Sequence, residues 1–274
     1  MDQGGGAAGG VSGGAGPMRL LCFPHAGASA AAFAGWAEAL AGGAEVVPVP
    51  LPGRGSVAAG GRITEPAVLL RRLVTHTGPL RTGRYALYGH SLGGLVAHAL
   101  AAELRRQRLP GPELVVIGAA VPPRPAAGAP QDTRGLSGTA GLRGAGGIGL
   151  RGAAGLPDGE LLDLLVAHGT LPERARSWSR RVLPALRDDL RLAEALATAG
   201  AGPGSVLDSP LLAVAGVDDP IAPPGAMAGW ARFAGAGFRL ARVPGGHLFV
   251  GCPPVLRLLR TVLGSAPRAL VPEH

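Results

Sequence analysis

The 274-residue chain contains no lysine, only two cysteines and few aromatic residues, which make up 4% of it. All 26 basic residues are therefore arginines, and the formal net charge is +8. A positive charge favours encounters with acidic partners, but the arginines are scattered and no aromatic-studded basic patch accompanies them. We attribute the arginine content to the coding bias of a GC-rich genome and expect no nucleic-acid partner.

Cysteine pairs and membrane spans are also missing. Cys22 and Cys252 cannot form a disulfide framework or a four-ligand zinc site. No stretch approaches the roughly 18 apolar residues that span a bilayer. The segment Met1–Pro17 lacks the basic start and apolar centre of a signal peptide. The sequence therefore predicts a cytoplasmic protein that does not contact the membrane.

Glycine and proline, with 47 and 26 residues, are concentrated in a few stretches between apolar runs. The Gly- and Ala-rich segment 1–17 predicts a disordered leader. Residues 18–274 are enough for one globular domain with a substantial core. Six apolar segments predict strands: Met18–Phe23, Glu45–Val49, Arg84–Tyr88, Leu114–Ala120, Leu211–Gly216 and Phe238–Val243.

Segments with apolar residues at helical spacing alternate with these strands. This alternation predicts an α/β fold, with a mostly parallel central sheet and helices on both faces. The expected helices are Ala30–Leu40, Pro66–Leu80, Leu92–Arg106, Gly225–Phe233 and Pro254–Leu263.

A long stretch without strand signals, about residues 123–205, interrupts this alternation. It begins with a Gly-rich part, Arg134–Gly155, and continues with three helical segments: Asp158–Ala167, Pro172–Arg181 and Leu183–Leu196. An insertion near the carboxyl ends of the strands predicts a helical lid over an active site.

The strongest local signal is the G-x-S-x-G sequence Gly89–Gly93, which follows a predicted strand and opens a predicted helix. In that context a tight turn projects the hydroxyl of Ser91 above the sheet as a nucleophile. The free N–H of Leu92, at the helix N-terminus, would point at a developing oxyanion. Without a catalytic role, the same pattern would be an inert serine in a glycine-rich turn.

A nucleophilic serine needs a base and an acid that orients the base. His247 follows the last predicted strand on a glycine-rich loop, and His25 lies on a comparable loop and is the alternative base. Asp218 and Asp219 both follow the preceding strand, and spacing does not separate them. The chain order serine, aspartate, histidine is that of α/β-hydrolases.

A second oxyanion donor is expected on the loop after the first strand, Pro24–Gly27, where the backbone N–H of Ala26 could face that of Leu92. No cluster with metal-ligand spacing accompanies these residues, and the glycines of the leader do not form a phosphate loop. We therefore expect no metal and no bound cofactor.

These motifs resemble those of the type II thioesterases that accompany nonribosomal peptide and polyketide synthases. The combination of F-P-H-A-G, L-P-G-R-G and P-G-G-H-x-F is much more specific than G-x-S-x-G alone. The matching stretches, in family order over roughly residues 18–263, are Cys22–Gly27, Leu51–Gly55, Tyr88–Gly94, Leu156–Asp158, Glu160–Leu162, Leu183–Asp189, Gly216–Pro220 and Pro244–Phe249.

The resemblance implies an α/β-hydrolase fold with a helical lid, and hydrolysis of acyl groups from the phosphopantetheine arm of acyl or peptidyl carrier proteins. It makes Ser91 the nucleophile and His247 the base. It favours Asp219 as the acid, because this aspartate directly precedes the matching Pro-x-Ala segment. Ala26 and Leu92 would supply the oxyanion N–H groups.

Three features depart from the family pattern. The stretch Arg134–Gly155 resembles an insertion, Val57–Gly61 interrupts the segment after Pro-Gly-Arg-Gly, and Ala28 stands where a second glycine is common. None of them affects the expected triad, but the first leaves the shape of the lid and the acyl-chain preference open.

The expected partner is an acidic carrier protein, and arginines of the lid segment could dock it, although a solvated helix face explains them equally well. These arginines are Arg174, Arg176, Arg180, Arg181 and Arg187. The absence of a coiled-coil heptad predicts a monomer. Two other functions use the same sequence features: a small-molecule esterase or lipase with the same triad, and a non-catalytic carrier-binding scaffold.

Overall fold

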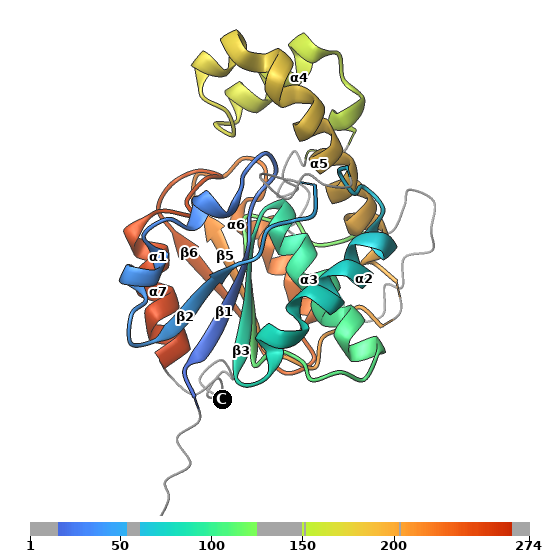
Figure 1. The fold of residues 1–274 in the computed structure, drawn as a ribbon. Helices are drawn as coiled ribbons and strands as arrows, with labels where there is room; N and C mark the ends of the chain where they lie inside the picture. The colour runs from blue at the N-terminus through green and yellow to red at the C-terminus, as the bar shows by residue number, and fades with distance from the viewer. Residues whose placement is uncertain (1–15, 54–60, 125–149, 151, 203, 265–274) are drawn as a thin grey trace, which may run out of the picture.

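The computed structural model describes residues 16–53, 61–124, 150, 152–202 and 204–264. Its centre is a six-stranded sheet in the order β2-β1-β3-β4-β5-β6, in which every pair of neighbours is parallel (Figure 1). The predicted α/β fold with a parallel sheet is confirmed. The strands are β1 (Met18–Phe23), β2 (Ala44–Pro48), β3 (Tyr85–His90), β4 (Leu114–Gly118), β5 (Leu211–Gly216) and β6 (Phe238–Val243).

Both faces of the sheet are covered, because successive side chains of a strand point to opposite sides and every residue of β3, β4 and β5 is buried. One face packs against α2 (Pro66–Thr77) and α3 (Leu92–Arg106). The other packs against α1 (Trp36–Ala39) and α7 (Pro253–Gly264). Figure 1 shows these two pairs of helices on opposite sides of the strands.

Several predicted helices are divided into shorter pieces. Ala30–Leu40 forms the 3₁₀ turn η1 (Ala30–Phe33) and α1, because Gly35 between them has a φ of 76°, which ends a right-handed helix. Pro66–Leu80 forms α2 and the 3₁₀ turn η3 (Gly78–Arg81). The remaining pieces, in place of Gly225–Phe233, are α6 (Pro224–Met227) and η6 (Ala228–Phe233).

The prediction of two separate helices, Pro172–Arg181 and Leu183–Leu196, is wrong. The 3₁₀ segment η5 (Glu173–Trp178) leads into one long helix, α5 (Ser179–Ala199), which runs through Pro184. A proline near the start of a helix removes one backbone hydrogen bond. Burial of leucines on either side of it offsets that loss.

The segment between β4 and β5 forms a small apolar cluster of its own, which contains η4 (Ala153–Gly155), α4 (Asp158–Ala167) and the first half of α5. In Figure 1 this lid lies above the end of the sheet opposite the start of β1. The second half of α5 enters the main core, where Leu192 and Leu196 are buried. α5 therefore connects the lid to the core.

Two sequence expectations fall mostly outside the described residues: the leader 1–17 and the Gly-rich stretch 134–155. Among the described helices, none combines the length and the hydrophobicity that a bilayer span requires.

Candidate active site

Ser91 lies on the tight turn between β3 and α3. Its φ of 54° is unusual for a residue other than glycine, and such strain is maintained only where the surrounding structure fixes the backbone. The N–H of Ser91 donates to the carbonyl oxygen of Gly118 on β4, at 2.7 Å. The turn is therefore tied to the neighbouring strand.

Glycines allow the strand, the turn and the helix to approach one another closely. A Cβ atom on Gly89 would lie 1.9 Å from the carbonyl oxygen of Gly93, and one on Gly93 would lie 2.1 Å from that of Phe23. No side chain fits at either position. The two glycines of the G-x-S-x-G sequence are thus required by packing.

His247 lies between Ser91 and Asp219. Its Nε2 is 3.0 Å from Oγ of Ser91, and its Nδ1 is 2.9 Å from Oδ2 of Asp219. Because a carboxylate accepts, Nδ1 carries the proton and Nε2 is free to accept from the serine hydroxyl. The structure thus brings together the three residues singled out in the sequence.

Asp219 is buried, while the neighbouring Asp218 is exposed. The Oδ1 atom of Asp219 also accepts hydrogen bonds from the N–H groups of Ile221 and Ala222, at 2.8 and 3.0 Å. Burial favours the neutral carboxyl, but the hydrogen bond and charge of His247 and the two amides more than offset it. The pKa of Asp219 is consequently held below its ordinary value.

His25, the alternative base, lies beside the site but makes no hydrogen bond to Ser91. Its Nδ1 is buried without a hydrogen-bond partner among the described residues. Burial, reinforced by the nearby His247 and opposed by Asp189, lowers the pKa of His25 to about 4. This imidazole is therefore neutral at pH 7.

His90, next to the serine, supports the loop that carries His247. Its Nε2 lies 2.8 Å from the carbonyl oxygen of His247 and its Nδ1 lies 3.3 Å from the hydroxyl of Tyr88. The carbonyl can only accept, so Nε2 donates and Nδ1 accepts from the tyrosine. Burial is the main cause that lowers the pKa of His90 well below its usual value, which keeps this neutral tautomer in place.

The backbone N–H groups of Leu92 and Ala26 border the serine. Leu92 is the first residue of α3, so its N–H has no acceptor within the helix. The carbonyl of His25 accepts from the N–H of Ala28, at 3.1 Å, and in a trans peptide the N–H of Ala26 points the opposite way. Neither amide donates a hydrogen bond within the described part of the chain.

A cavity of about 140 Å³ opens above Ser91, beneath the lid. His25, Ala26 and His247 line its floor with the serine. Its remaining walls are largely apolar and come mostly from the lid: Leu150, Leu165, Thr170, Leu171, Val182, Leu186, Leu190 and Leu248. The site therefore pairs a serine with a base below an apolar pocket. This arrangement suits the transfer of an apolar acyl group to the serine hydroxyl.

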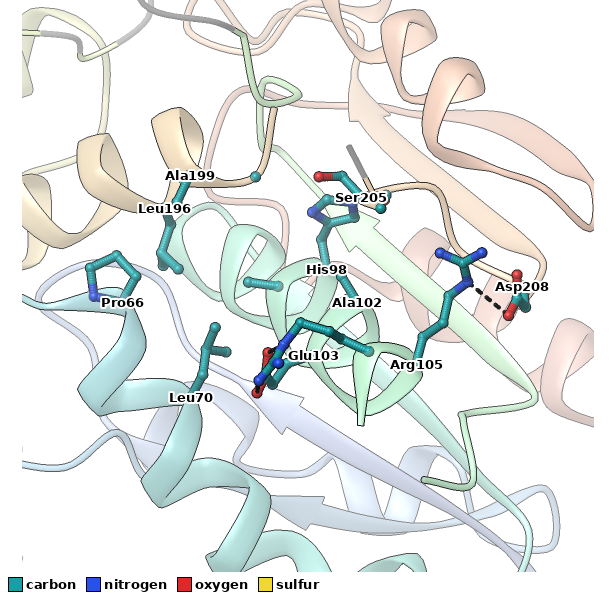
Figure 2. A pocket seen from close by; sticks show the side chains of 14 residues that line it. Pro66, Leu70, His98, Ala102, Glu103, Arg105, Leu196, Ala199, Ser205 and Asp208 are labelled. Atoms are coloured by element: carbon teal, nitrogen blue, oxygen red, sulfur yellow. Dashed lines mark hydrogen bonds and ion pairs between the residues drawn. The ribbon is translucent and has the colours of Figure 1, made fainter. Parts of the chain in front are cut away.

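A larger hollow lies between α2, α3 and the end of α5, and its lining also includes a histidine and a serine (Figure 2). Its volume is about 460 Å³. Nε2 of His98 lies 2.9 Å from the backbone carbonyl of Ser205, whose hydroxyl donates to the carbonyl of Gly202. Arg105 pairs with Asp208 at its rim. Among the described residues no base contacts the hydroxyl of Ser205, which donates to a backbone carbonyl instead, so this hollow shows no activated nucleophile there.

Sequence reasoning gave no role to Asp189, which the structure places against the loop that carries Ala26. Its side chain accepts a hydrogen bond from the N–H of Gly27, at 2.7 Å. The sequence feature that indicates its burial is its position on α5. Asp189 directly precedes Leu190 and follows Leu186 by three residues, so it lies on the apolar side of the helix.

No group of three or more His, Cys, Asp or Glu side chains is arranged to hold a metal ion in the described ranges. Ser91, His247 and Asp219 have the hydrogen-bond arrangement of a serine-hydrolase triad.

Comparisons with protein-family models and with known proteins identify the same family. A protein-family model described as a thioesterase domain matches residues 18–262. Thioesterase PikA5 of Streptomyces venezuelae is 33% identical over 235 residues, which are 85% of this chain and 75% of that protein.

Solved structures agree with this match. RedJ, a thioesterase from the prodiginine biosynthetic pathway in Streptomyces coelicolor, is 31% identical, with a TM-score of 0.71 over 90% of this chain and 85% of that one. BorB, a type II thioesterase from the borrelidin biosynthetic cluster, is 26% identical, with a TM-score of 0.70 over 90% and 93% of the two chains.

The buried His98 generates a prediction about pH and stability. Burial lowers its pKa from 6.5 to about 4, so between these values the unfolded chain binds a proton that the folded protein does not. The free energy of unfolding therefore falls as the pH falls, by about 2 kcal/mol between pH 7 and pH 5 for this one group. Urea unfolding at both pH values should show that His98→Gln reduces the fall by this amount.

The matched control is His76→Gln, which makes the same replacement at an exposed histidine of α2 and shows how much of the change any such replacement causes. An unchanged pH dependence in His98→Gln would contradict the assignment of a neutral His98.

Proposed function

The chain belongs to the thioesterase family, and we propose that it hydrolyses acyl thioesters on the phosphopantetheine arm of carrier proteins in polyketide or nonribosomal peptide biosynthesis. The names of its relatives support this pathway: RedJ acts in prodiginine biosynthesis and BorB comes from the borrelidin cluster. The observation that carries the proposal is the hydrogen-bonded chain from Ser91 through His247 to Asp219 beneath an apolar pocket.

In the first step His247 takes the proton of Ser91 while Oγ attacks the thioester carbonyl. The N–H groups of Leu92 and Ala26 stabilise the negative charge that develops on the carbonyl oxygen. The C–S bond then breaks, and the departing pantetheine thiolate takes the proton from His247, which makes the imidazole a free base again. A thiol of this kind has a pKa of about 8.5, so it departs with little help from an acid.

In the second step His247 takes a proton from water, which attacks the acyl-Ser91 ester. The ester C–O bond then breaks, His247 returns the proton to Oγ of Ser91, and the acyl chain leaves as a carboxylic acid. Asp219 holds the imidazole in the tautomer that both steps need and stabilises its positive charge. The apolar lid walls receive the acyl chain, and the phosphopantetheine belongs to the substrate rather than to the enzyme.

The same triad would serve a small-molecule esterase. The family match favours thioesters, and the preference between thioester and oxygen ester is the measurement that separates the two. A non-catalytic scaffold has no physical need for an ordered serine, histidine and aspartate at hydrogen-bond distances.

The carrier protein would reach the pocket across the lid. Of the arginines expected to dock it, two are already paired on the lid: Arg176 with Asp163 and Glu173, and Arg187 with Asp158. The others, Arg174, Arg180 and Arg181, are exposed and have no carboxylate partner among the described residues. We assign the contact with an acidic carrier protein to these three.

The first test presents the wild type and Ser91→Ala with an acyl-phosphopantetheinyl carrier protein and a matched oxygen ester, and follows acyl loss by intact mass. The wild type should cleave the carrier thioester in preference, and Ser91→Ala should be slower by about 10³–10⁶-fold because it lacks the nucleophile. Cleavage of the oxygen ester alone would establish a general esterase. Full activity of Ser91→Ala would remove the serine from the mechanism.

The two adjacent aspartates offer a matched pair of variants. Asp219→Asn should lower kcat by about 10⁴-fold, because an amide no longer fixes the productive tautomer of His247. Asp218→Asn changes an exposed side chain and should leave kcat within about twofold of the wild type. Steady-state kinetics on a small acyl thioester compares them, and equal losses in both variants would contradict the choice of Asp219.

Charge reversal tests the docking surface. The double variant Arg180→Glu/Arg181→Glu should raise KM for the acyl carrier protein by about tenfold, by removing attraction and adding repulsion. Activity on a small acyl thioester should not change. Arg257→Glu/Arg260→Glu on α7, away from the lid, makes the same change in net charge and is the control. Equal effects of the two double variants would assign the attraction to net charge alone.

A further inference from the structure

Only two carboxylates are buried among the described residues: Asp219 of the triad and Asp189 of α5. A carboxylate without exposed surface is costly unless partners are supplied. In the described part of the chain, two other segments supply partners to Asp189. Nη2 of Arg62 donates to Oδ1 at 2.8 Å, and the backbone N–H of Gly27 donates to Oδ2 at 2.7 Å.

These contacts fall on the loop that follows β1 and carries Ala26. Gly27 has a φ of 76°, in the left-handed region where glycine is favoured. Its N–H belongs to the peptide group that follows Ala26. The peptide group that precedes Ala26 is held by the hydrogen bond from Ala28 to His25. Ala26 therefore lies between two peptide groups whose orientations are fixed, one of them by Asp189.

We propose that Asp189 is a positioning residue for the oxyanion hole, which aims the N–H of Ala26 at the reacting carbonyl by holding the N–H of Gly27. The inference rests on the proposed function, because it assigns Ala26 to the oxyanion. It also makes the oxyanion hole depend on α5, whose first half belongs to the lid. A displaced α5 would remove the acceptor from Gly27.

The alternative is a purely structural role, in which the ion pair between Asp189 and Arg62 only holds α5 against the main domain. Loss of that pair would lower stability and leave the reactivity of the folded protein unchanged. A positioning role instead lowers the reactivity of Ser91 in the folded protein. The neighbouring Asp188 lies 3.9 Å from Nε of Arg62 and 3.0 Å from Arg191, and does not contact the loop. It provides the matched control.

The test measures the rate of labelling of Ser91 by an alkyl fluorophosphonate, well below the melting temperature of every variant. In this reaction Oγ displaces fluoride from phosphorus, His247 takes the proton, and the phosphoryl oxygen occupies the oxyanion hole. Loss of an oxyanion donor costs about 10²–10³ in rate. We expect Asp189→Ala, which misdirects a donor, to slow labelling by about 10–100-fold and Asp188→Ala to label like the wild type.

Asp189→Asn provides a second variant if Asp189→Ala does not fold. It retains the shape of the side chain and an oxygen that accepts from Gly27, but as a neutral and weaker acceptor. We expect its labelling rate to lie between those of the wild type and Asp189→Ala. With a small acyl thioester, kcat should fall in the same order while KM stays constant.

Wild-type labelling rates in both Asp189 variants, or an equal loss in Asp188→Ala, would overturn the inference. Fluorophosphonate labelling needs the triad and the oxyanion hole but no thioester. The series therefore gives the same answer if the substrate class proposed above is wrong, and the two failures are distinguishable.

Discussion

The close approach of β3, the serine turn and α3 is the constraint on which the rest of the site depends. Gly89 and Gly93 leave no room for a side chain, and the N–H of Ser91 is committed to β4. The turn therefore has one conformation, in which the hydroxyl projects above the sheet and the first amide of α3 remains free. Each other element of the site is placed relative to this fixed point.

The parallel sheet supplies those other elements. The loops that follow β1, β3, β5 and β6 all leave the same edge of the sheet, and they carry Ala26, Ser91, Asp219 and His247 respectively. Ser91 and His247, which are 156 positions apart in the sequence, thereby come together, with 3.0 Å between Oγ and Nε2. The lid adds apolar walls, and α5 joins these walls to the main core and to the loop of Ala26.

Much of this arrangement was predictable from local patterns. Ser91 and the two adjacent aspartates follow buried strands, and His247 follows the edge strand β6 on a glycine-rich loop, so the fold class, the serine and the histidine were predictable from the sequence. Asp218 and Asp219 could not be separated by spacing, because burial and the amides of Ile221 and Ala222 distinguish them only in three dimensions.

Pro184 suggested a helix boundary that packing of the adjacent leucines overrides. The contact between Asp189 and Gly27 joins residues 162 positions apart, and no local pattern specifies such a pairing.

The central claim is that Ser91 carries the acyl group between the two steps, and partitioning of that intermediate tests it most directly. The same acyl group is supplied on a carrier-bound pantetheine and on a small thiol, with methanol present to compete with water. A shared acyl-Ser91 predicts one ratio of methyl ester to acid for both substrates, since the thiol has left before the acyl group is captured. A ratio that changes with the thiol would contradict the account, because water would then attack while the thiol is still bound.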